Sequence, residues 1–308
     1  MCKKLIVIVV IVVMGTLPMP SKASYTETHY PIVLVHGLLG FDSLLGVYDY
    51  YFRIPAALES GGATVYVANL SAANSSELRG EQLIDELDTL HAIYGHARFN
   101  LIGHSHGGPT IRYVASVRPD LVASVTSVGS PHTGSAVADA IDQGVAEGSW
   151  QESVLASLVD ALAALIDFLS GDLHPQDALA ALGSLSSAGA AQFNADHPQG
   201  LPASACGHGP AQVNGIRYYS FGGTRVVTNL LDISDYMLAA SSLFFPSGQQ
   251  NDGLVERCSS HLGTVVRSDY PWNHLDQVNQ IFGLRGWFTP NPTSVYRAHA
   301  NRLKNAGL

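Results

Sequence analysis

The sequence Gly-His-Ser-His-Gly at residues 103–107 constrains the fold most strongly. The mostly apolar residues 99–102 before it predict a short buried strand, and Gly108 to Val117 after it predict a helix. Glycines two residues before and after a serine permit a sharp turn from strand to helix, because a Cβ there would collide with neighbouring backbone. The pattern predicts that Ser105 is a nucleophile at the end of a strand. An ordinary glycine-rich turn is the alternative.

Strand and helix patterns alternate along the first half of the chain. Residues 75–94 have a helical pattern, with Ser76 as a candidate N-cap and Gly95 as the stop. Continuous apolar runs predict strands that are buried on both faces, at residues 32–35, 63–68 and 122–128. This alternation predicts an α/β fold, in which a mostly parallel sheet has helices on both faces.

The middle of the chain has a different pattern. Residues 146–192 contain no convincing strand, and apolar residues recur at helical spacing from Val154 to Leu169. This segment is either a core-facing helix or a lid, over about residues 146–171, that turns its apolar face outward at a lipid surface. Strands are expected again at 218–221 and 264–267, and a helix at 295–304.

The N-terminus has the pattern of an export signal. Lys3 and Lys4 precede an apolar run of residues 5–14, and Ser21-Lys22-Ala23 offers a cleavage site between small residues. The apolar run is shorter than a bilayer-spanning helix requires, although a retained membrane anchor is the alternative. We therefore expect a secretory signal peptide at 1–23, a mature domain at 24–308 and a secreted protein.

Charge and cysteine content limit the partners and the redox compartment. The formal net charge is −9 and the predicted signal contains three lysines, so the mature domain is more acidic still. An acidic domain argues against nucleic acid as a partner and is compatible with a hard divalent cation. Cys2 leaves with the signal, and Cys206 and Cys258 predict a disulfide in an exported chain. Two separate buried thiols are the alternative.

A serine hydroxyl needs a base, and the base is usually a histidine oriented by a carboxylate. In the α/β-hydrolase order the acid follows the serine and the histidine comes last. Asp252 is favoured because a glycine follows it in a turn, and His274 because it follows the strand expected at 264–267. His261 is the main alternative to His274, and the other late acids remain open, namely Asp232, Asp235, Asp269 and Asp276.

The chain resembles the secreted bacterial true lipases of the Pseudomonas type, in the subfamily that matures with a membrane-bound foldase. The most specific match is the run from Asn100 to Arg112 around the serine. The other matching runs spread over nearly the whole mature chain, at 30–37, 79–83, 251–255, 258–263 and 273–284. The resemblance implies an α/β-hydrolase fold with a helical lid at about 146–171.

The resemblance also implies residue roles. The catalytic triad would be Ser105, Asp252 and His274, and His261 would then be a structural histidine. The backbone N–H groups of Leu38 and His106 would form the oxyanion hole. The family often has methionine at the position of Leu38, but a backbone donor does not depend on the side chain.

One structural calcium ion is implied near the catalytic histidine. Its ligands would be the carboxylates of Asp232 and Asp276 and the carbonyl groups of Gln280 and Leu284, all hard oxygen donors. The alternative for Asp232 is a helix N-cap or turn residue. The resemblance also assigns the family's single disulfide to Cys206 and Cys258 and implies a lipase-specific foldase as the maturation partner.

The expected activity is hydrolysis of water-insoluble triacylglycerols at an oil–water interface, through an acyl-enzyme. An esterase or phospholipase acting on smaller or more polar esters is the alternative enzyme. A secreted binding protein on a hydrolase scaffold is the non-catalytic alternative.

Overall fold

The computed structural model describes residues 24–38, 40, 43–44, 48–145, 148–149, 151–157, 159–160 and 176–308. Within these residues, seven strands form one sheet in the order β4-β1-β5-β6-β8-β7, and β9 also pairs with β8. All neighbours are parallel except β7 and β8. The strands are β1 (Ile32–Val35), β4 (Val65–Val67), β5 (Phe99–His104), β6 (Val122–Val128), β7 (Gln212–Val213), β8 (Ile216–Gly223) and β9 (Thr264–Tyr270), with a separate pair β2 (Ser43–Leu44) and β3 (Tyr48–Asp49).

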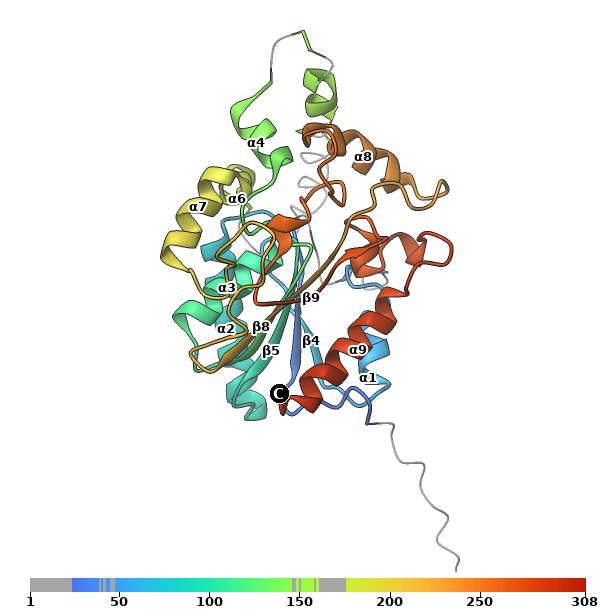
Figure 1. The fold of residues 1–308 in the computed structure, drawn as a ribbon. Coiled ribbons are helices and arrows are strands. Elements are labelled where there is room, and N and C mark those ends of the chain that lie inside the picture. Colours follow the sequence, from blue (N-terminus) through green and yellow to red (C-terminus); the bar gives the residue numbers. More distant parts are fainter. Residues whose placement is uncertain are drawn as a thin grey trace, which may run out of the picture.

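Helices cover both faces of the sheet. Figure 1 shows α2 and α3 against one face, and α1 and α9 against the other. The helices are α1 (Ile54–Glu59), α2 (Ser76–Tyr94), α3 (Gly107–Val117), α4 (Ala136–Gln143), α6 (Ala178–Leu185), α7 (Ser187–Asp196), α8 (Ile233–Ser241) and α9 (Pro292–Asn305). Four short 3₁₀ turns complete the described elements: η1 (Ser242–Phe244), η2 (Cys258–Ser260), η3 (Asp276–Val278) and η4 (Ile281–Gly283).

Strand β1 explains why the sheet strands are continuously apolar. Val33 and Val35 pack into the core on the side of α2 and α3. Ile32 and Leu34 pack into the second core, on the side of α1 and α9. All four side chains are buried, and each contributes about 1.5–3 kcal/mol of transfer free energy. This central packing makes β1 and β5 a rigid support for the loops at their carboxyl ends.

The α/β fold expected from the sequence is confirmed, with small differences at element ends. The strand predicted at 122–128 is β6 with the same bounds, and Gly95 ends α2 in the left-handed conformation as predicted. The predicted N-cap Ser76 is wrong by one residue. Ser75 is the cap, since its side chain accepts a hydrogen bond from the Leu78 N–H at 3.2 Å.

Two predicted segments lie wholly or largely outside the described residues. The signal peptide predicted at 1–23 is not among them, and only parts of the lid predicted at about 146–171 are. Residues 151–157 are helical. No helix within the described ranges is both long enough and apolar enough to cross a bilayer.

Candidate active site

Ser105 lies on a strained turn between β5 and α3. Its φ is +53°, a left-handed conformation that a non-glycine residue adopts only at some cost in free energy. A Cβ on Gly103 would lie 2.3 Å from the carbonyl oxygen of Gly107, and a Cβ on Gly107 would lie 2.3 Å from that of Val35. The two glycines therefore have the steric role inferred from the sequence, and they hold Ser105 at the carboxyl end of the sheet.

The loop after β1 passes directly beside Ser105. A Cβ on Gly37 would lie 2.7 Å from the Cβ of Ser105. Leu38 is the next residue along the chain from this close contact. His106 is the N-cap of α3, where backbone N–H groups have no partner within the helix. The predicted oxyanion residues Leu38 and His106 thus belong to two segments that adjoin the serine turn, the loop after β1 and the start of α3.

A buried arginine supports the loop after β1. The guanidinium of Arg79, on α2, donates to the carbonyl of His36 at 2.6 Å and also to the carbonyl of Ser71. Burial lowers the pKa of Arg79 to about 10, so the group stays charged at neutral pH. Its contact with His36 fixes the backbone two residues before Leu38.

Asp252 and His274 form a buried hydrogen-bonded pair. The His274 Nδ1–H donates to Asp252 Oδ2 at 2.8 Å, and the His274 backbone N–H donates to the Asp252 carbonyl at 2.8 Å. The other carboxylate oxygen, Oδ1, accepts from the N–H groups of Leu254 and Val255 at 3.0 and 2.7 Å. Because Nδ1 is engaged by the carboxylate, Nε2 is the ring nitrogen left to act as a base.

Sequence reasoning missed a second partner of the Asp252 carboxylate. Gln277 Nε2 donates to the same Oδ2 at 2.6 Å, and the Gln277 side chain is fully buried. It lies against Gly129 at the end of β6. The only sequence signal was its place three residues after His274. That spacing by itself does not distinguish an amide that donates to Asp252 from an amide on the surface.

His104, the residue before Ser105, connects the serine turn to the His274 loop. Its Nε2 lies 3.0 Å from the His274 carbonyl oxygen, and the two rings are 4.6 Å apart. Since a carbonyl only accepts, Nε2 carries the proton and Nδ1 accepts from the Tyr50 hydroxyl at 2.6 Å. Burial lowers the pKa of His104 well below its usual range, so the ring stays neutral. The contact brings Ser105 and His274 to the same end of the sheet.

The residues predicted to bind calcium fit a cation in part. Asp276 follows the His274 loop in η3, is buried, and has an Oδ1 atom with no hydrogen-bond partner among the described residues. Burial raises the pKa of Asp276 to about 7, and repulsion from Asp235 and Asp232 adds to the effect. A buried carboxylate beside two others is the environment that a divalent cation would stabilise.

Asp232 already has a structural role. It is the N-cap of α8, and its Oδ1 accepts from the Ser234 N–H at 2.8 Å and from the Ser234 hydroxyl at 2.6 Å. The alternative of Asp232 as a cap therefore describes its present contacts. Clusters of three or more His, Cys, Asp or Glu suited to a metal do not occur in the described ranges. The predicted set has only two carboxylates, so this does not test it.

Comparison with known proteins now places the chain in a family. The α/β-hydrolase fold family matches residues 30–278. The triacylglycerol lipase of Vibrio cholerae is 56% identical over 94% of this chain and 92% of its own length. That of Pseudomonas fragi is 46% identical over 92% of this chain and 98% of its own length. The chain is a bacterial true lipase of the Pseudomonas type, in the α/β-hydrolase family. The resemblance identified in the sequence is confirmed.

Solved structures agree on the fold. A Bacillus licheniformis lipase in mature form has a TM-score of 0.63 at 18% identity, covering 94% of this chain and 96% of its own. The Staphylococcus hyicus lipase has a TM-score of 0.60 at 18% identity, covering 94% of this chain and 99% of its own. At such low identity the likeness concerns the architecture alone.

The disulfide predicted for this family is present. Cys206 and Cys258 are bonded, with their Cα atoms 4.7 Å apart. His261 follows the bridge, and its Nδ1 lies 3.1 Å from the carbonyl oxygen of Gly207. His261 therefore belongs to the surroundings of the bridge rather than to the Asp252–His274 pair.

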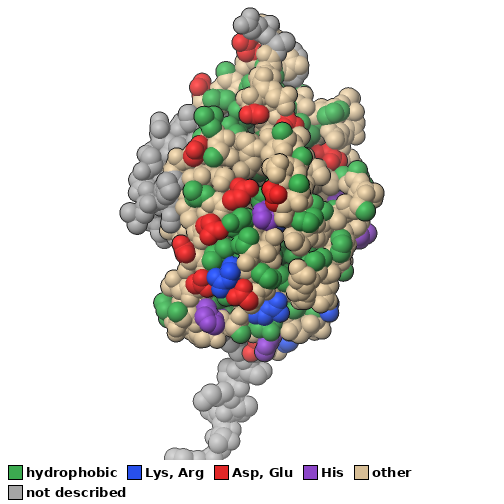
Figure 2. All heavy atoms as spheres, turned by 90° about the vertical axis from the view of Figure 1, so that its left-hand side faces the viewer, with side chains coloured by type: hydrophobic (Ala, Val, Ile, Leu, Met, Phe, Trp, Pro, Cys, Tyr) green, Lys and Arg blue, Asp and Glu red, His purple; other side chains and the backbone are tan. Residues whose placement is uncertain are grey.

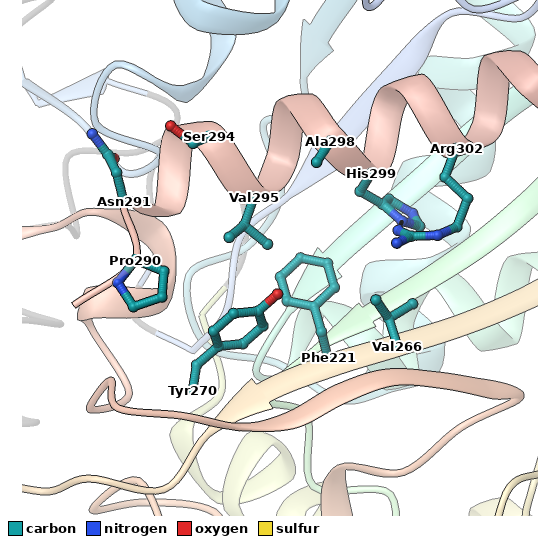
Figure 3. Close-up of a pocket in the computed structure, with 10 residues that line it drawn as sticks. All are labelled: Phe221, Val266, Tyr270, Pro290, Asn291, Ser294, Val295, Ala298, His299 and Arg302. Carbon is teal, nitrogen blue, oxygen red and sulfur yellow. Dashed lines mark hydrogen bonds between the residues drawn. The ribbon is translucent and has the colours of Figure 1, made fainter.

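A separate hollow of about 260 Å³ lies away from these residues, between α9 and strands β8 and β9. Figure 3 shows Phe221, Val266, Tyr270 and Val295 lining its apolar part. None of the residues predicted for the site lines this hollow. It is a gap in helix-on-sheet packing rather than part of the lipase site.

Proposed function

We propose that the protein hydrolyses the ester bonds of water-insoluble triacylglycerols through an acyl-enzyme on Ser105. The observation that carries the proposal is the buried Asp252–His274 pair at the carboxyl end of the sheet, beside the strained turn of Ser105. The triacylglycerol lipase relatives supply the substrate class.

The residues have complementary roles in this reaction. His274 takes the proton of the Ser105 hydroxyl through Nε2 as the hydroxyl attacks the ester carbonyl, and it returns the proton to the departing alcohol. Asp252 stabilises the imidazolium that forms in between. The N–H groups of Leu38 and His106 hold the oxyanion, and such donors each contribute about 3–4 kcal/mol to lowering the barrier. Water then releases the fatty acid by the same route.

Replacement of the serine tests the assignment. Ser105→Ala is expected to abolish hydrolysis of emulsified triolein while leaving the melting temperature close to that of the parent. Retention of activity by this variant would remove Ser105 from the mechanism.

The main alternative is an esterase or phospholipase that prefers smaller or more polar esters. A substrate series separates the two, since a lipase should gain activity when a short-chain triglyceride exceeds its solubility and forms droplets. An enzyme whose rate follows dissolved ester alone, with no gain at droplet formation, would be an esterase.

We also propose a structural calcium ion held by the carboxylates of Asp232 and Asp276 and the carbonyl groups of Gln280 and Leu284. The partnerless Asp276 oxygen supports this site. When bound, the ion would neutralise the buried carboxylates and hold in place the loop that carries His274, since Asp276 lies only two residues after it. It takes no part in the proton transfers described above.

Secretion and the maturation partner are further parts of the proposal. The signal pattern at residues 1–23 and the Cys206–Cys258 bridge support export through an oxidising compartment. Membership of the family supports a lipase-specific foldase during maturation. Expression with and without such a foldase, followed by assay of the exported protein, would test this partner.

A further inference from the structure

An exposed apolar surface lies near the candidate active site, on segments of the chain other than the one predicted as the lid. We call it the apolar rim and define it by Leu230, Leu231, Ile233, Tyr236, Trp287 and Phe288. Leu231 and Trp287 are 83% and 82% exposed, and Phe288 is fully exposed. Large apolar side chains exposed together in this way are typical of a docking surface.

Two segments distant in sequence build the rim. The first leads into α8, and the second connects η4 to α9. Asn229 Nδ2 donates to the Arg285 carbonyl at 3.1 Å, and a Cβ on Gly286 would lie 3.3 Å from the Thr228 carbonyl oxygen. The two segments therefore adjoin, and their exposed side chains belong to one surface. In Figure 1, α8 lies at the end of the molecule opposite the C-terminus.

The charges of these segments favour a lipid surface as the partner. Residues 225–241 and 279–290 contain four charged groups, namely Arg225, Asp232, Asp235 and Arg285. Both aspartates are buried, Arg225 is exposed, and Arg285 is half-buried. Figure 2 shows a different face, the side of α2 and α7 in Figure 1, where carboxylates are scattered over the surface. In an acidic chain, two apolar segments with an exposed arginine and no exposed carboxylate of their own suit a layer of lipid headgroups.

The backbone holds the second segment in an unusual conformation. Ile281 and Phe288 have φ values of +51° and +63°, in the left-handed region that bulky residues rarely occupy. Such strain is retained where surrounding structure imposes it, often at functional sites. Here it accompanies an outward-facing Phe288, whereas Trp272, just before the His274 loop, is completely buried.

We propose that the apolar rim docks the protein on a lipid surface, with Trp287 and Phe288 inserted at the boundary between headgroups and acyl chains. Tryptophan and phenylalanine favour this boundary because their rings combine large apolar area with polarisable faces. The proposal rests on the lipase function above. It adds an anchor within 20 residues of His274, so that docking holds the carboxyl end of the sheet at the lipid.

The chain provides its own fluorescent reporter. It has three tryptophans, of which Trp272 is buried, Trp287 is exposed and Trp150 lies outside the described residues. In a protein carrying Ser105→Ala and Trp150→Phe, binding to phosphatidylcholine vesicles should shift the emission to shorter wavelength. Vesicles with brominated acyl chains should quench it. In the same background, further substitution Trp287→Phe should leave an emission that neither vesicle type changes.

Binding of substituted proteins tests the anchor directly. The double substitution Trp287→Ser, Phe288→Ser should lower vesicle partitioning of the Ser105→Ala protein at least about tenfold, because two large apolar groups no longer leave water. A matched control, Ile93→Ser with Val117→Ser, removes exposed apolar groups at the C-terminal ends of α2 and α3. These helix ends lie just before the starts of β5 and β6, away from the carboxyl ends of the strands. It should partition like the parent. Equal losses in both variants, or no loss in the first, would overturn the proposal.

Two assays on the active protein separate this proposal from the function itself. With Ser105 present, the rim variant should hydrolyse dissolved p-nitrophenyl butyrate like the parent and emulsified triolein at least about tenfold more slowly. If the parent hydrolyses neither ester, the proposed function fails. If both esters are hydrolysed equally by parent and variant, only the rim fails. The last test measures the molar mass of the parent and of the double variant by light scattering. A dimeric parent and a monomeric variant would show that the rim binds a second copy of the chain, and would overturn the proposal.

Discussion

Asp252 is the most constrained side chain of the candidate site. Its two oxygens accept four hydrogen bonds, from Leu254, Val255, Gln277 and His274. A carboxylate held in this way cannot rotate, so it presents one fixed acceptor to the His274 ring. The orientation of the proposed base is therefore set by groups that never touch the substrate.

Gln277 is expected to be a positioning residue for the reaction. Gln277→Leu keeps the volume and removes the amide that donates to Asp252, and a hydrogen bond to a charged group contributes about 1.5–3 kcal/mol. We expect kcat for a soluble ester to fall about 10- to 100-fold with KM nearly unchanged. Gln192→Leu on the exposed side of α7 is the control and should have parental kinetics. An unchanged kcat for Gln277→Leu would show that the backbone donors alone orient Asp252.

His299 on α9 couples stability to pH. Its Nδ1 accepts from Arg302 at 2.9 Å, and its Nε2 bonds the Thr126 hydroxyl at 2.8 Å. Figure 3 shows the side chains of His299 and Arg302 next to each other. Burial lowers the pKa of His299 to about 3, and the charge of Arg302 adds to the effect. The unfolded chain takes up a proton as pH falls through about 6.5, whereas the folded chain does not until about pH 3. Stability is therefore lost on acidification across this window.

The corresponding experiment is urea unfolding at pH 7 and pH 4. His299→Gln keeps a donor and an acceptor without a titrating group, so its free energy of unfolding should fall less between the two pH values. The difference from the parent should be on the order of 1.4 kcal/mol per pH unit below 6.5. His29→Gln at an exposed position is the control. Equal slopes for the parent and His299→Gln would contradict the linkage.

At the scale of elements, the beginning of α2 matters because Arg79 and Ser76 both lie in its first turns. Ser76 bonds the His106 ring at 3.0 Å, and Arg79 holds the carbonyl of His36. The same helix therefore contacts both loops that would supply the oxyanion donors. Its first turn must be well ordered for either contact to persist.

Removal of the cap should loosen this turn. Ser75→Ala deletes the oxygen that accepts from the Leu78 N–H, and loss of a serine N-cap costs about 1 kcal/mol. For a domain of this size we expect the melting temperature to fall by about 3 °C. Ser247→Ala, in an exposed loop, should leave it unchanged. A variant of Ser75 with parental stability would show that packing of α2 alone defines its first turn.

At the scale of the whole molecule, the site is assembled from the ends of five strands. Loops after β1, β5, β6, β8 and β9 meet at the carboxyl edge of the sheet, which is the usual place for sites in α/β folds. The connection from β9 to α9 carries His274, three of the four predicted calcium ligands and part of the apolar rim. Ordering of this connection should therefore affect stability and activity together.

Chelation tests the proposed calcium ion at this scale. Removing an ion that binds only the folded state should lower the melting temperature, by about 5 °C when the ion was well above its dissociation constant. EDTA should lower the melting temperature of the parent, and added calcium should restore it. Asp276→Asn should be insensitive to both treatments. A parent with the same melting temperature in EDTA and in calcium would refute the site.

Local sequence was sufficient for the elements and for the serine turn. Strand β6 and the end of α2 were predictable because burial on both faces and a left-handed glycine leave direct marks on neighbouring residues. The turn at Ser105 was predictable because its two glycines leave room for backbone that a Cβ would strike, that of Gly107 within the turn and that of Val35 on the neighbouring strand. Long-range pairing of Asp252 with His274 needed the family resemblance, since several late acids and histidines had acceptable spacing.

The amino-acid order alone thus determined the alternation of strands and helices, the sharp turn at Ser105 and the family to which the chain belongs. Only the folded chain decided that Gln277 bonds Asp252, that His104 bonds the His274 carbonyl, and that Trp287 stands in solvent beside α8. The first set depends on sterics and burial patterns between near neighbours. The second depends on which loops come into contact once the sheet has formed. No local sequence pattern encodes those contacts.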